Sequence, residues 1–294
     1  MKFLHTADLH IGKRVRGFSL VDEQRHALDQ IASIAARERV SAVLVAGDVF
    51  DKPVPPVEAL DLLETFLAQI SQAGIPCILI AGNHDSADRL AFGARFMSDS
   101  LVHIARPFSR TPQFVDLASG NECARIHLLP FVRPLHVKLA YPEEADGIAT
   151  YTDALRVAAS HQPLANSGAN ILMAHQFVVD GAQGPATCDS ETVSVGGLDS
   201  VEASVFDAFD YVALGHIHGA QRVRRDPVRY SGSLYPYSFS EAGRKKSCGI
   251  VEIDGRSTAG DDARFRSYTP VEFDEVRSLR EVNCSFEELQ AAAA

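Results

Sequence analysis

Hydrophobic positions follow two different rhythms along the 294-residue chain. In the first hundred residues, short apolar runs alternate with stretches in which apolar residues recur every three or four positions. This alternation is typical of β-strands connected by amphipathic helices. The pattern predicts strands at 2–7, 43–46 and 77–81 and helices at 20–39 (Ala27, Leu28, Ile31, Ile34 and Ala35 on one face), around 60–70 (marked by Leu60, Leu63, Leu67 and Ile70) and at 86–98.

Beyond residue 101 the pattern is richer in strands. Apolar runs are separated by turn-forming residues, and the segment 180–200, rich in Gly, Ser and Asp, is predicted to be a loop. The whole order predicts an α/β fold in which two β-sheets form a sandwich flanked by helices. The expected strands are 114–117, 125–129, 171–174, 211–214, 229–231, 249–253 and 265–268, and the expected helix is 151–160.

Five of the predicted strands run directly into side chains that commonly bind metal ions. The carboxyl ends of strands in open α/β sheets lie along one edge, so these side chains are expected to meet there. The residues are Asp8 and His10 after the first strand, Asp48 after the second, Asn83, His84 and Asp85 after the third, His175 after the strand at 171–174, and His216 and His218 after the strand at 211–214.

Local geometry favours convergence of these side chains. In an extended segment, residues i and i+2 point the same way, so Asp8 and His10 are expected to bind one ion together. By the same argument His216 and His218 are expected to reach a shared site. Three glycines before the ligand motifs allow sharp turns without a Cβ clash. They are Gly47, Gly82 and Gly215.

Each motif alone has an ordinary structural interpretation, because a buried histidine is most often a core residue and a Gly-Asp pair is a common turn. The conjunction of all the motifs at strand ends favours a metal centre. Four imidazoles, an amide and two carboxylates suit manganese, iron or zinc better than magnesium or calcium. Two such cations about 3.5–4 Å apart can neutralise a phosphodiester and promote its hydrolysis.

Composition restricts the setting and the partners. No apolar run approaches the roughly 20 residues that cross a bilayer, and five scattered cysteines without a CxxC pair indicate a reducing, cytoplasmic setting. A net charge of -10 predicts weak unaided binding to nucleic acid. Basic residues beside the ligand motifs offer a local basic rim. They are Lys13, Arg14, Arg16, Arg222, Arg224, Arg225, Arg244, Lys245 and Lys246.

The chain resembles the calcineurin-like metallophosphoesterases in five motifs that occur in the order typical of that family. These are Asp8-x-His10, Gly47-Asp48, Gly82-Asn83-His84-Asp85, His175 and Gly215-His216-x-His218. A closer resemblance, from residue 1 to about 270, is to the SbcD family of nuclease subunits of bacterial SbcCD complexes. The SbcD family is related to the double-strand-break repair nucleases of archaea and eukaryotes. The segments that carry the closer resemblance are HTADLHIGK, SLVDEQRHALDQI, GDVFD, LPFVRP and YSGSLYPYSFSEAGRKKS.

The resemblance implies a manganese-dependent DNA nuclease that acts in DNA repair, recombination and replication. Its implied activities are duplex-end exonuclease and single-strand or hairpin endonuclease. It implies two Mn²⁺ ions, with Mg²⁺, Fe²⁺ and Zn²⁺ left open, a catalytic acid at His84, and Asp85 orienting His84. The implied ligands are Asp8, His10, Asp48 and His218 for one ion and Asp48, Asn83, His175 and His216 for the other, so that Asp48 bridges both.

The resemblance also implies domains and partners. Residues 1–268 would form the nuclease domain, and residues 269–294 would begin a truncated capping and partner-binding region. The expected partners are DNA, an SbcC-type coiled-coil ATPase and a second copy of the chain, with no membrane and a cytoplasmic, nucleoid-associated location. The sequence has no Walker A motif, so ATP-driven steps are expected from the ATPase. Candidates for the dimer surface, which fit a core equally well, are Leu90, Phe92, Phe96 and Met97.

Two other functions compete with the nuclease. A protein phosphatase or cyclic-nucleotide phosphodiesterase would share the ligand residues, but the SbcD-like segments outside those residues favour the nuclease. A non-catalytic scaffold with the same fold typically loses ligands or the catalytic histidine. Both are present in this chain.

Overall fold

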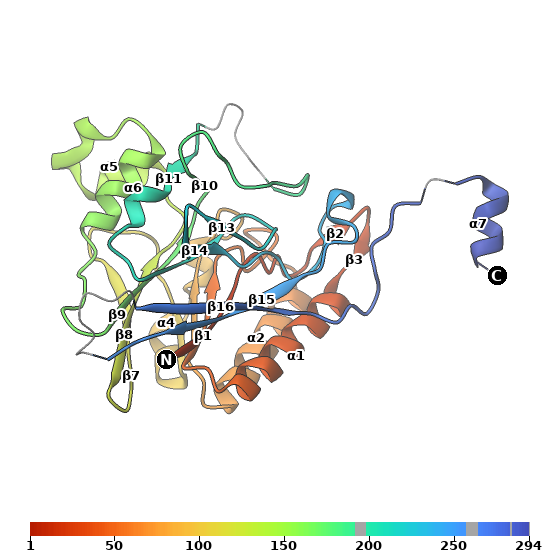
Figure 1. The fold of residues 1–294 in the computed structure, drawn as a ribbon, viewed down its shortest axis with the longest axis horizontal. Helices are drawn as coiled ribbons and strands as arrows, with labels where there is room; N and C mark the ends of the chain where they lie inside the picture. The colour runs from red at the N-terminus through yellow and green to blue at the C-terminus, as the bar shows by residue number, and fades with distance from the viewer. Residues whose placement is uncertain (192–197, 257–263, 283, 294) are drawn as a thin grey trace.

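Two six-stranded β-sheets pack face to face, and helices cover both outer faces of this sandwich (Figure 1). The computed structural model describes residues 1–191, 198–256, 264–282 and 284–293. The predicted fold class, an α/β two-sheet sandwich flanked by helices, is confirmed. The order in the first sheet is β16 (Phe265–Glu272), β15 (Ser247–Ile253), β1 (Lys2–Thr6), β4 (Ala42–Ala46), β5 (Cys77–Ile80) and β6 (Val102–Ile104).

The second sheet has the same mixed character as the first. Each sheet contains four parallel strands. In the first sheet these are β1, β4, β5 and β6, with antiparallel pairing at β15 and β16 on one side, whereas the second sheet has an antiparallel strand at each edge. The order in the second sheet is β13 (Gln221–Val223), β14 (Arg225–Tyr230), β12 (Tyr211–Gly215), β9 (Ala169–His175), β8 (Glu122–Leu129) and β7 (Gln113–Ser119). The parallel strands β1, β4, β5, β9 and β12 are those that run into the ligand motifs.

The central strands are buried on both faces, which explains their uninterrupted apolar runs. Side chains alternate between the faces of a strand, so Val43 and Val45 of β4 pack with helices α1 (Val21–Glu38) and α2 (Val57–Gln72). Leu44 between them packs against the second sheet. On the opposite outer face, Leu172 and Leu214 pack with α5 (Pro134–Ala140) and α6 (Tyr151–Ser160). The result is four layers, with a hydrophobic core between each pair.

The helices predicted from apolar spacing are largely correct. α1 buries the residues expected on its inner face, and α6 has the bounds that the sequence predicts. In α2, Leu63 and Ile70 are buried, but Leu60 is 47% exposed. Its apolar stripe is therefore wider than the face that contacts the core.

The continuous helix predicted at 86–98 is wrong. The structure has two short helices, α3 (Ala87–Leu90) and α4 (Ala94–Met97), followed by the 3-10 turn η1 (Ser98–Ser100). Gly93 between them has a φ of +77°, a left-handed conformation that a right-handed helix does not contain. The break leaves Phe92 84% and Phe96 86% exposed, whereas Leu90 is buried in the core.

Several short elements escape prediction because they are too short to show a hydrophobic period. These short elements include β2 (Arg14–Val15), β3 (Phe18–Ser19), η2 (Pro142–Gly147), β10 (Val178–Val179), β11 (Val201–Glu202), η4 (Ala203–Phe206) and η5 (Phe239–Glu241).

Residues 192–197 of the predicted loop at 180–200 lie outside the described residues.

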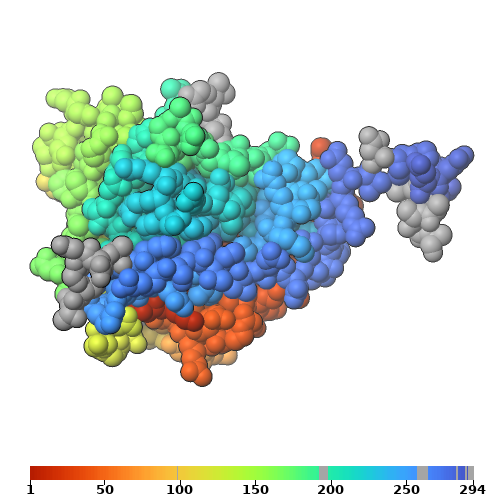
Figure 2. All heavy atoms as spheres, in the orientation of Figure 1, coloured from red at the N-terminus to blue at the C-terminus, as the bar shows by residue number. Residues whose placement is uncertain are grey.

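The C-terminal segment leaves the sandwich after β16. Phe273 still packs in the core beneath α1, and its N–H donates to the carbonyl of Lys246 at 2.8 Å. Helix α7 (Phe286–Ala293) lies apart from the body, as the ribbon and the space-filling view show (Figure 1, Figure 2). The domain boundary expected at residue 268 stays a prediction. In the described part of the chain, no helix has the length and apolar character needed to cross a bilayer.

Candidate metal centre

The predicted metal ligands come together at one edge of the sandwich, where strands of both sheets end. The expected single row of strand ends is instead two facing rows, one from each sheet. Hydrogen bonds join the rows: His175 Nδ1 lies 2.8 Å from the carbonyl oxygen of Ala46, and the His216 N–H donates to the Asp8 carboxylate at 2.9 Å. Asp8, His10, Asp48 and Asn83 follow strands of the first sheet, and His175, His216 and His218 come from the second.

Four of the predicted ligands have a positive φ: Asp8 at 52°, His10 at 43°, Asp48 at 49° and His216 at 105°. Left-handed backbone costs a non-glycine residue about 1–2 kcal/mol, and such strain clusters at functional sites. The segment Asp8–His10 is therefore not extended, and the reason given for its convergence is wrong. The two side chains do converge, because the backbone turns at both residues.

The three glycines serve different purposes. Only Gly47 has a left-handed φ, of +91°. A Cβ on Gly82 would lie 2.1 Å from Asp48 Oδ1, and one on Gly215 would lie 1.9 Å from the carbonyl oxygen of Ala46. Gly82 and Gly215 are thus required for close packing around the ligands and not for the sharp turns expected from the sequence.

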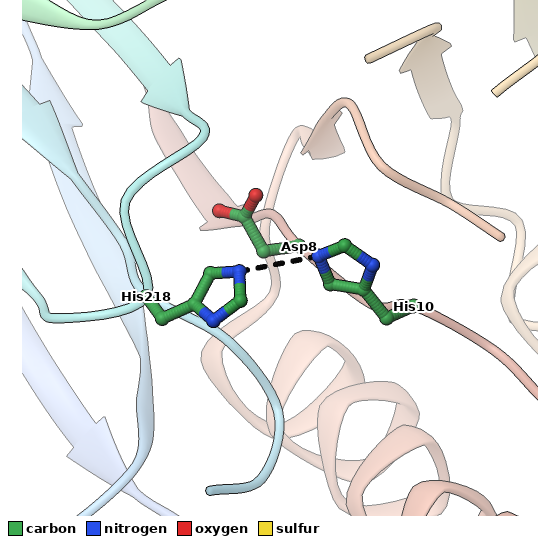
Figure 3. Close-up of side chains that lie close together, drawn as sticks. All are labelled: Asp8, His10 and His218. Carbon is green, nitrogen blue, oxygen red and sulfur yellow. Dashed lines mark hydrogen bonds between the residues drawn. The ribbon is translucent and has the colours of Figure 1, made fainter. Parts of the chain in front are cut away.

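Asp8, His10 and His218 form a first ligand set, defined by ligand atoms that all lie within 4.8 Å of one another (Figure 3). Figure 3 shows the rings of His10 and His218 turned toward each other beside the Asp8 carboxylate. Their Nε2 atoms are 3.2 Å apart, and all three side chains are buried. Buried nitrogens that face each other require a proton or a cation between them, since two lone pairs repel.

Asn83, His175 and His216 form a second ligand set. Asn83 Oδ1 lies 3.0 Å from His175 Nε2 and 2.9 Å from His216 Nδ1. His216 therefore turns toward this set, and His218 turns toward the first. The shared site expected from their i, i+2 spacing is wrong, because the positive φ of His216 redirects its side chain.

Asp48 lies between the two ligand sets. Its Oδ2 is 3.5 Å from His10 Nε2 and 3.4 Å from His175 Nε2. Its Oδ1 accepts a hydrogen bond from the His84 N–H at 2.8 Å. One carboxylate oxygen thus faces both sets, which is the arrangement that a bridging ligand needs.

His84 lies beside the centre without joining either set. Its ring contacts the His10 ring edge-on, with centroids 4.8 Å apart, and its ligand atom is close to those of His10 and Asp48. Its Nδ1 is 3.1 Å from the carbonyl oxygen of Asp51. A carbonyl only accepts, so Nδ1 carries the proton and Nε2 is left for another partner.

Asp85 does not contact the His84 ring through any hydrogen bond in the described residues. Its carboxylate instead accepts from the N–H groups of Val49, Phe50 and Gly82 at 2.9–3.0 Å. The predicted orienting contact is therefore corrected: the Asp51 carbonyl holds the ring. Asp85 ties the loop after β4 to the loop after β5, because its charge satisfies three backbone donors.

Burial and neighbouring charges shift the pKa values of the side chains in the centre. Burial raises the pKa of Asp8 to about 7 and lowers the pKa of His216 to about 3. Burial alone would lower the pKa of His175, but the charge and hydrogen bond of Asp48, the charge of Asp8 and the hydrogen bond to the Ala46 carbonyl together raise it to about 9. Burial likewise opposes a charged His218, yet the nearby side chains of Cys188, Glu241 and Asp8 raise its pKa to about 10. The cluster therefore favours positive charge.

The residues fit a centre for two cations. The nitrogens that face the two sets lie close to other ligand atoms: His10 Nε2 is 3.2 Å from His218 Nε2, and His216 Nδ1 is 2.9 Å from Asn83 Oδ1. Imidazole, carboxylate and amide donors suit first-row transition metals. Asp8, His10 and His218 would hold one ion, Asn83, His175 and His216 would hold the other, and Asp48 would contact both.

Cys188, Glu191 and His218 form another close group of potential ligands. Both oxygens of Glu191 are already hydrogen-bonded, to the N–H of His218 at 2.6 Å and to the N–H of Cys188 at 2.9 Å. This group therefore serves to anchor the loop 188–191 onto His218.

Sequence patterning missed the side chains that hold the ligand loops. Gln24 of α1 donates to the carbonyl of His10 at 2.7 Å and to the Tyr237 hydroxyl at 3.1 Å. The ring of Phe131 lies edge-on to that of His175, with centroids 6.4 Å apart. These residues lie in SLVDEQRHALDQI, YSGSLYPYSFSEAGRKKS and LPFVRP. The family resemblance was thus the one signal that could have found them.

Much of the expected basic rim is paired within the chain. Lys246 is buried and lies 2.5 Å from Glu241, so the expectation that it faces phosphates is wrong. A lysine this deep needs a buried acidic partner, which the sequence does not reveal. Four other residues of the rim form ion pairs: Lys13 with Asp51 at 2.8 Å, Arg222 with Asp226 at 3.1 Å, and Arg224 and Arg225 with Asp207 at 2.9 Å and 3.6 Å.

Comparison with known proteins places this geometry in context. The sequence profile described as calcineurin-like phosphoesterase matches residues 1–220, a range that contains every predicted ligand. Among solved structures, a dimetal phosphatase from Danio rerio is 13% identical, with 93% of this chain and 99% of that chain covered and a TM-score of 0.47. A Thermus thermophilus protein is also 13% identical, with the same coverage of 93% and 99% and a TM-score of 0.46.

Proposed function

This chain belongs to the calcineurin-like phosphoesterase family, and we propose that it is an SbcD-type nuclease that hydrolyses the phosphodiester backbone of DNA. Metal-dependent phosphoester hydrolysis follows from the family and from the clustered His and Asp side chains. One observation supports the narrower assignment. The SbcD-like segments outside the ligand positions supply Gln24, Asp51 and Tyr237, which contact the ligand loops or the His84 ring.

The chain's own residues would divide the work at the centre. When bound, two divalent cations supply positive charge to the phosphate and lower the pKa of water. Asp48 would hold the two ligand sets at a fixed separation. His175 is aimed at the second set because its Nδ1 is hydrogen-bonded to the Ala46 carbonyl. Preorganised ligands of this kind need no rearrangement during the reaction.

His84 would act as the general acid. It is only half-buried, whereas His10 and His175 are fully buried, so it lies nearer to solvent than they do. Its Nδ1–H is engaged by the Asp51 carbonyl at 3.1 Å, which leaves Nε2 to face substrate. A proton on Nε2 could then be donated to the leaving 3′ oxygen.

We also propose a homodimer, an SbcC-type ATPase partner and a nucleoid location. The homodimer has support in an apolar groove between α2 and the segment 89–104, with a cavity of about 450 Å³. Phe92 lines this groove, and Phe96 comes four residues later in the same segment of the chain. Both side chains are largely exposed. Exposed aromatic residues that adjoin an apolar groove are typical of interfaces. The ATPase and the location rest on the resemblance alone.

Substrate choice is tested by loading the full chain with Mn²⁺ and offering labelled single-stranded, hairpin and duplex DNA, a phosphopeptide and a cyclic nucleotide. We expect cleavage of DNA, without ATP, and no hydrolysis of the phosphopeptide. Hydrolysis of the phosphopeptide or cyclic nucleotide without DNA cleavage would identify a phosphatase or phosphodiesterase of the same family. No hydrolysis by a metal-loaded chain would indicate a scaffold.

A further inference from the structure

We propose that Ser190, Glu241 and Lys246 form a relay that positions His218, fixing its tautomer and ring orientation for the first ligand set. The relay rests on the metal-dependent centre proposed above, but it does not depend on DNA being the substrate. It also makes the loop 188–191 part of the metal site, although the loop supplies none of the predicted ligands.

Ser190 is the link between His218 and Glu241. Its hydroxyl lies 2.8 Å from His218 Nδ1 and 2.6 Å from Glu241 Oε1. The hydroxyl has one proton, and the carboxylate of Glu241 only accepts. Ser190 therefore donates to Glu241 and accepts from the Nδ1–H of His218. This leaves His218 Nε2 free to face the first ligand set, where it lies 3.2 Å from His10 Nε2.

Glu241 is itself held firmly. It is buried, and its Oε2 accepts from Lys246 Nζ at 2.5 Å. Its Oε1 also accepts from the N–H of Tyr237 at 3.1 Å and from the Ser238 hydroxyl at 2.9 Å. A carboxylate with this many donors keeps its charge and its position, so it can orient Ser190.

Lys246 holds the backbone of His218, in addition to its contact with Glu241. Its Nζ donates to the carbonyl oxygen of His218 at 2.9 Å and to the Ser233 hydroxyl at 2.9 Å. The N–H of His218 donates to Glu191 at 2.6 Å. Both backbone groups of His218 and its Nδ1 are thus satisfied by side chains.

The second ligand set is held differently. His175 Nδ1 is bonded to a backbone carbonyl, that of Ala46, which is fixed by the strand β4. Loss of the Ser190 relay should therefore weaken only the first set. Partners that orient a metal-binding histidine typically change metal affinity about 10–100-fold.

The test is a calorimetric titration of the full chain with Mn²⁺. We expect two binding events in the unsubstituted chain, and in Ser190→Ala one of them weakened about 10–100-fold with the other unchanged. Ser190→Thr, which keeps the hydroxyl, should restore the affinity. Ser238→Ala is the matched control, since Ser238 is also half-buried and donates to the same Glu241 oxygen but does not touch His218.

The signal of the bound Mn²⁺ in electron paramagnetic resonance gives a readout independent of activity. At a concentration of Mn²⁺ that fills only the second set of Ser190→Ala, we expect the spectrum of an isolated ion instead of a coupled pair. Two events of unchanged affinity in Ser190→Ala, or equal losses in Ser190→Ala and Ser238→Ala, would overturn the relay alone. An unsubstituted chain that bound no Mn²⁺ would overturn the two-cation centre first, and the relay with it.

Discussion

The loop after β5 withdraws polar side chains from solvent, whereas the segment that follows it exposes large apolar side chains. Asn83 and His84 are polar and partly withdrawn from solvent, and Asp85 is held by three backbone donors. A few residues later, the aromatic side chains of Phe92 and Phe96 are 84% and 86% exposed. One short stretch of chain thus places polar groups inside and large apolar groups outside.

Withdrawn polar side chains cost free energy unless they are paired, and exposed apolar side chains contribute no burial, so both placements need an explanation. A polar group that is buried without partners costs several kcal/mol, and exposed apolar surface forgoes roughly 25 cal/mol per Å² of burial. The polar residues are tolerated because they converge on the metal centre. The exposed aromatic residues need a different explanation, and association with a second chain supplies one.

The largest effect is expected from Asp48→Ala, which should disable the metal centre and leave the exposed aromatic surface unchanged. Asp48 Oδ2 faces both ligand sets, at 3.5 Å from His10 and 3.4 Å from His175. We expect the variant to bind neither Mn²⁺ ion tightly and to show no measurable cleavage of DNA, while its oligomeric mass is unchanged. Metal analysis, a DNA cleavage assay and light scattering measure the three properties.

Asp61→Ala is a suitable control for that variant, because Asp61 is an exposed carboxylate on α2. It should keep both metals and full activity. An Asp48→Ala protein that retained two metals and full activity would show that Asp48 does not bridge the sets.

His84→Gln should have the next largest effect. His84 is close to the centre but has its own partner, the Asp51 carbonyl at 3.1 Å. We expect both metals to remain bound and cleavage to fall by about 10²–10⁴-fold, the usual contribution of general acid catalysis. Loss of metal in His84→Gln would instead make His84 a ligand. His103→Gln, a half-buried histidine in β6, serves as the control.

Much of the metal centre was predictable, because ligand-type residues directly follow apolar strands. The sandwich was predictable too, since Val43–Ala46 and similar runs carry a strong strand pattern. Backbone direction was not: the positive φ of Asp8 and His216 arises from contacts across the two sheets, which no local pattern encodes. The break at Gly93 was missed because isolated glycines are often tolerated in helical patterns.

The residues that support the ligands were missed for a related reason. Lys246 and Glu241 read as exposed charges, since charged residues are almost never fully buried unless paired. Their pairing is local, but it depends on the turn between η5 and the start of β15, which no hydrophobic period marks. Asp85 was assigned to His84 from the family resemblance, yet its carboxylate turns back to the loop after β4.

A change in pH should have a smaller effect, which is expected on Mn²⁺ binding at the metal centre and not on the exposed aromatic surface. Burial opposes a charged ring, but Asp48, Asp8 and the Ala46 carbonyl together keep the pKa of His175 at about 9, and Cys188, Glu241 and Asp8 keep that of His218 at about 10. Both rings are thus protonated at neutral pH, whereas a metal ligand must be deprotonated. Mn²⁺ affinity should therefore rise as pH increases toward these values and fall as pH decreases.

Calorimetry at pH 7 in two buffers with different ionisation enthalpies measures this linkage. We expect release of about two to three protons as both ions bind, one each from His175 and His218 and about half a proton from Asp8, whose pKa of about 7 leaves it partly protonated. Binding without net proton release would contradict the proposed protonation of the two rings. Phe92→Asp, which leaves these rings untouched, should give the same proton count.

The smallest effect on chemistry, and the sharpest contrast with the metal centre, is expected from Phe92→Asp combined with Phe96→Asp. Leu90 is a poor probe of this surface, because it is buried and its replacement would test folding. A charge at a central aromatic residue of an interface removes about 2 kcal/mol or more, which corresponds to roughly 30-fold weaker association. Light scattering should therefore show a dimer that becomes a monomer, while Mn²⁺ binding and cleavage of short single strands stay unchanged.

Leu135→Asp is the control, because Leu135 lies on α5, is 62% exposed and lies outside the groove. This variant should leave the dimer intact. A folded double variant with the mass of the unsubstituted chain would exclude this face as the interface, and loss of metal in that variant would show that the two halves of the comparison are coupled.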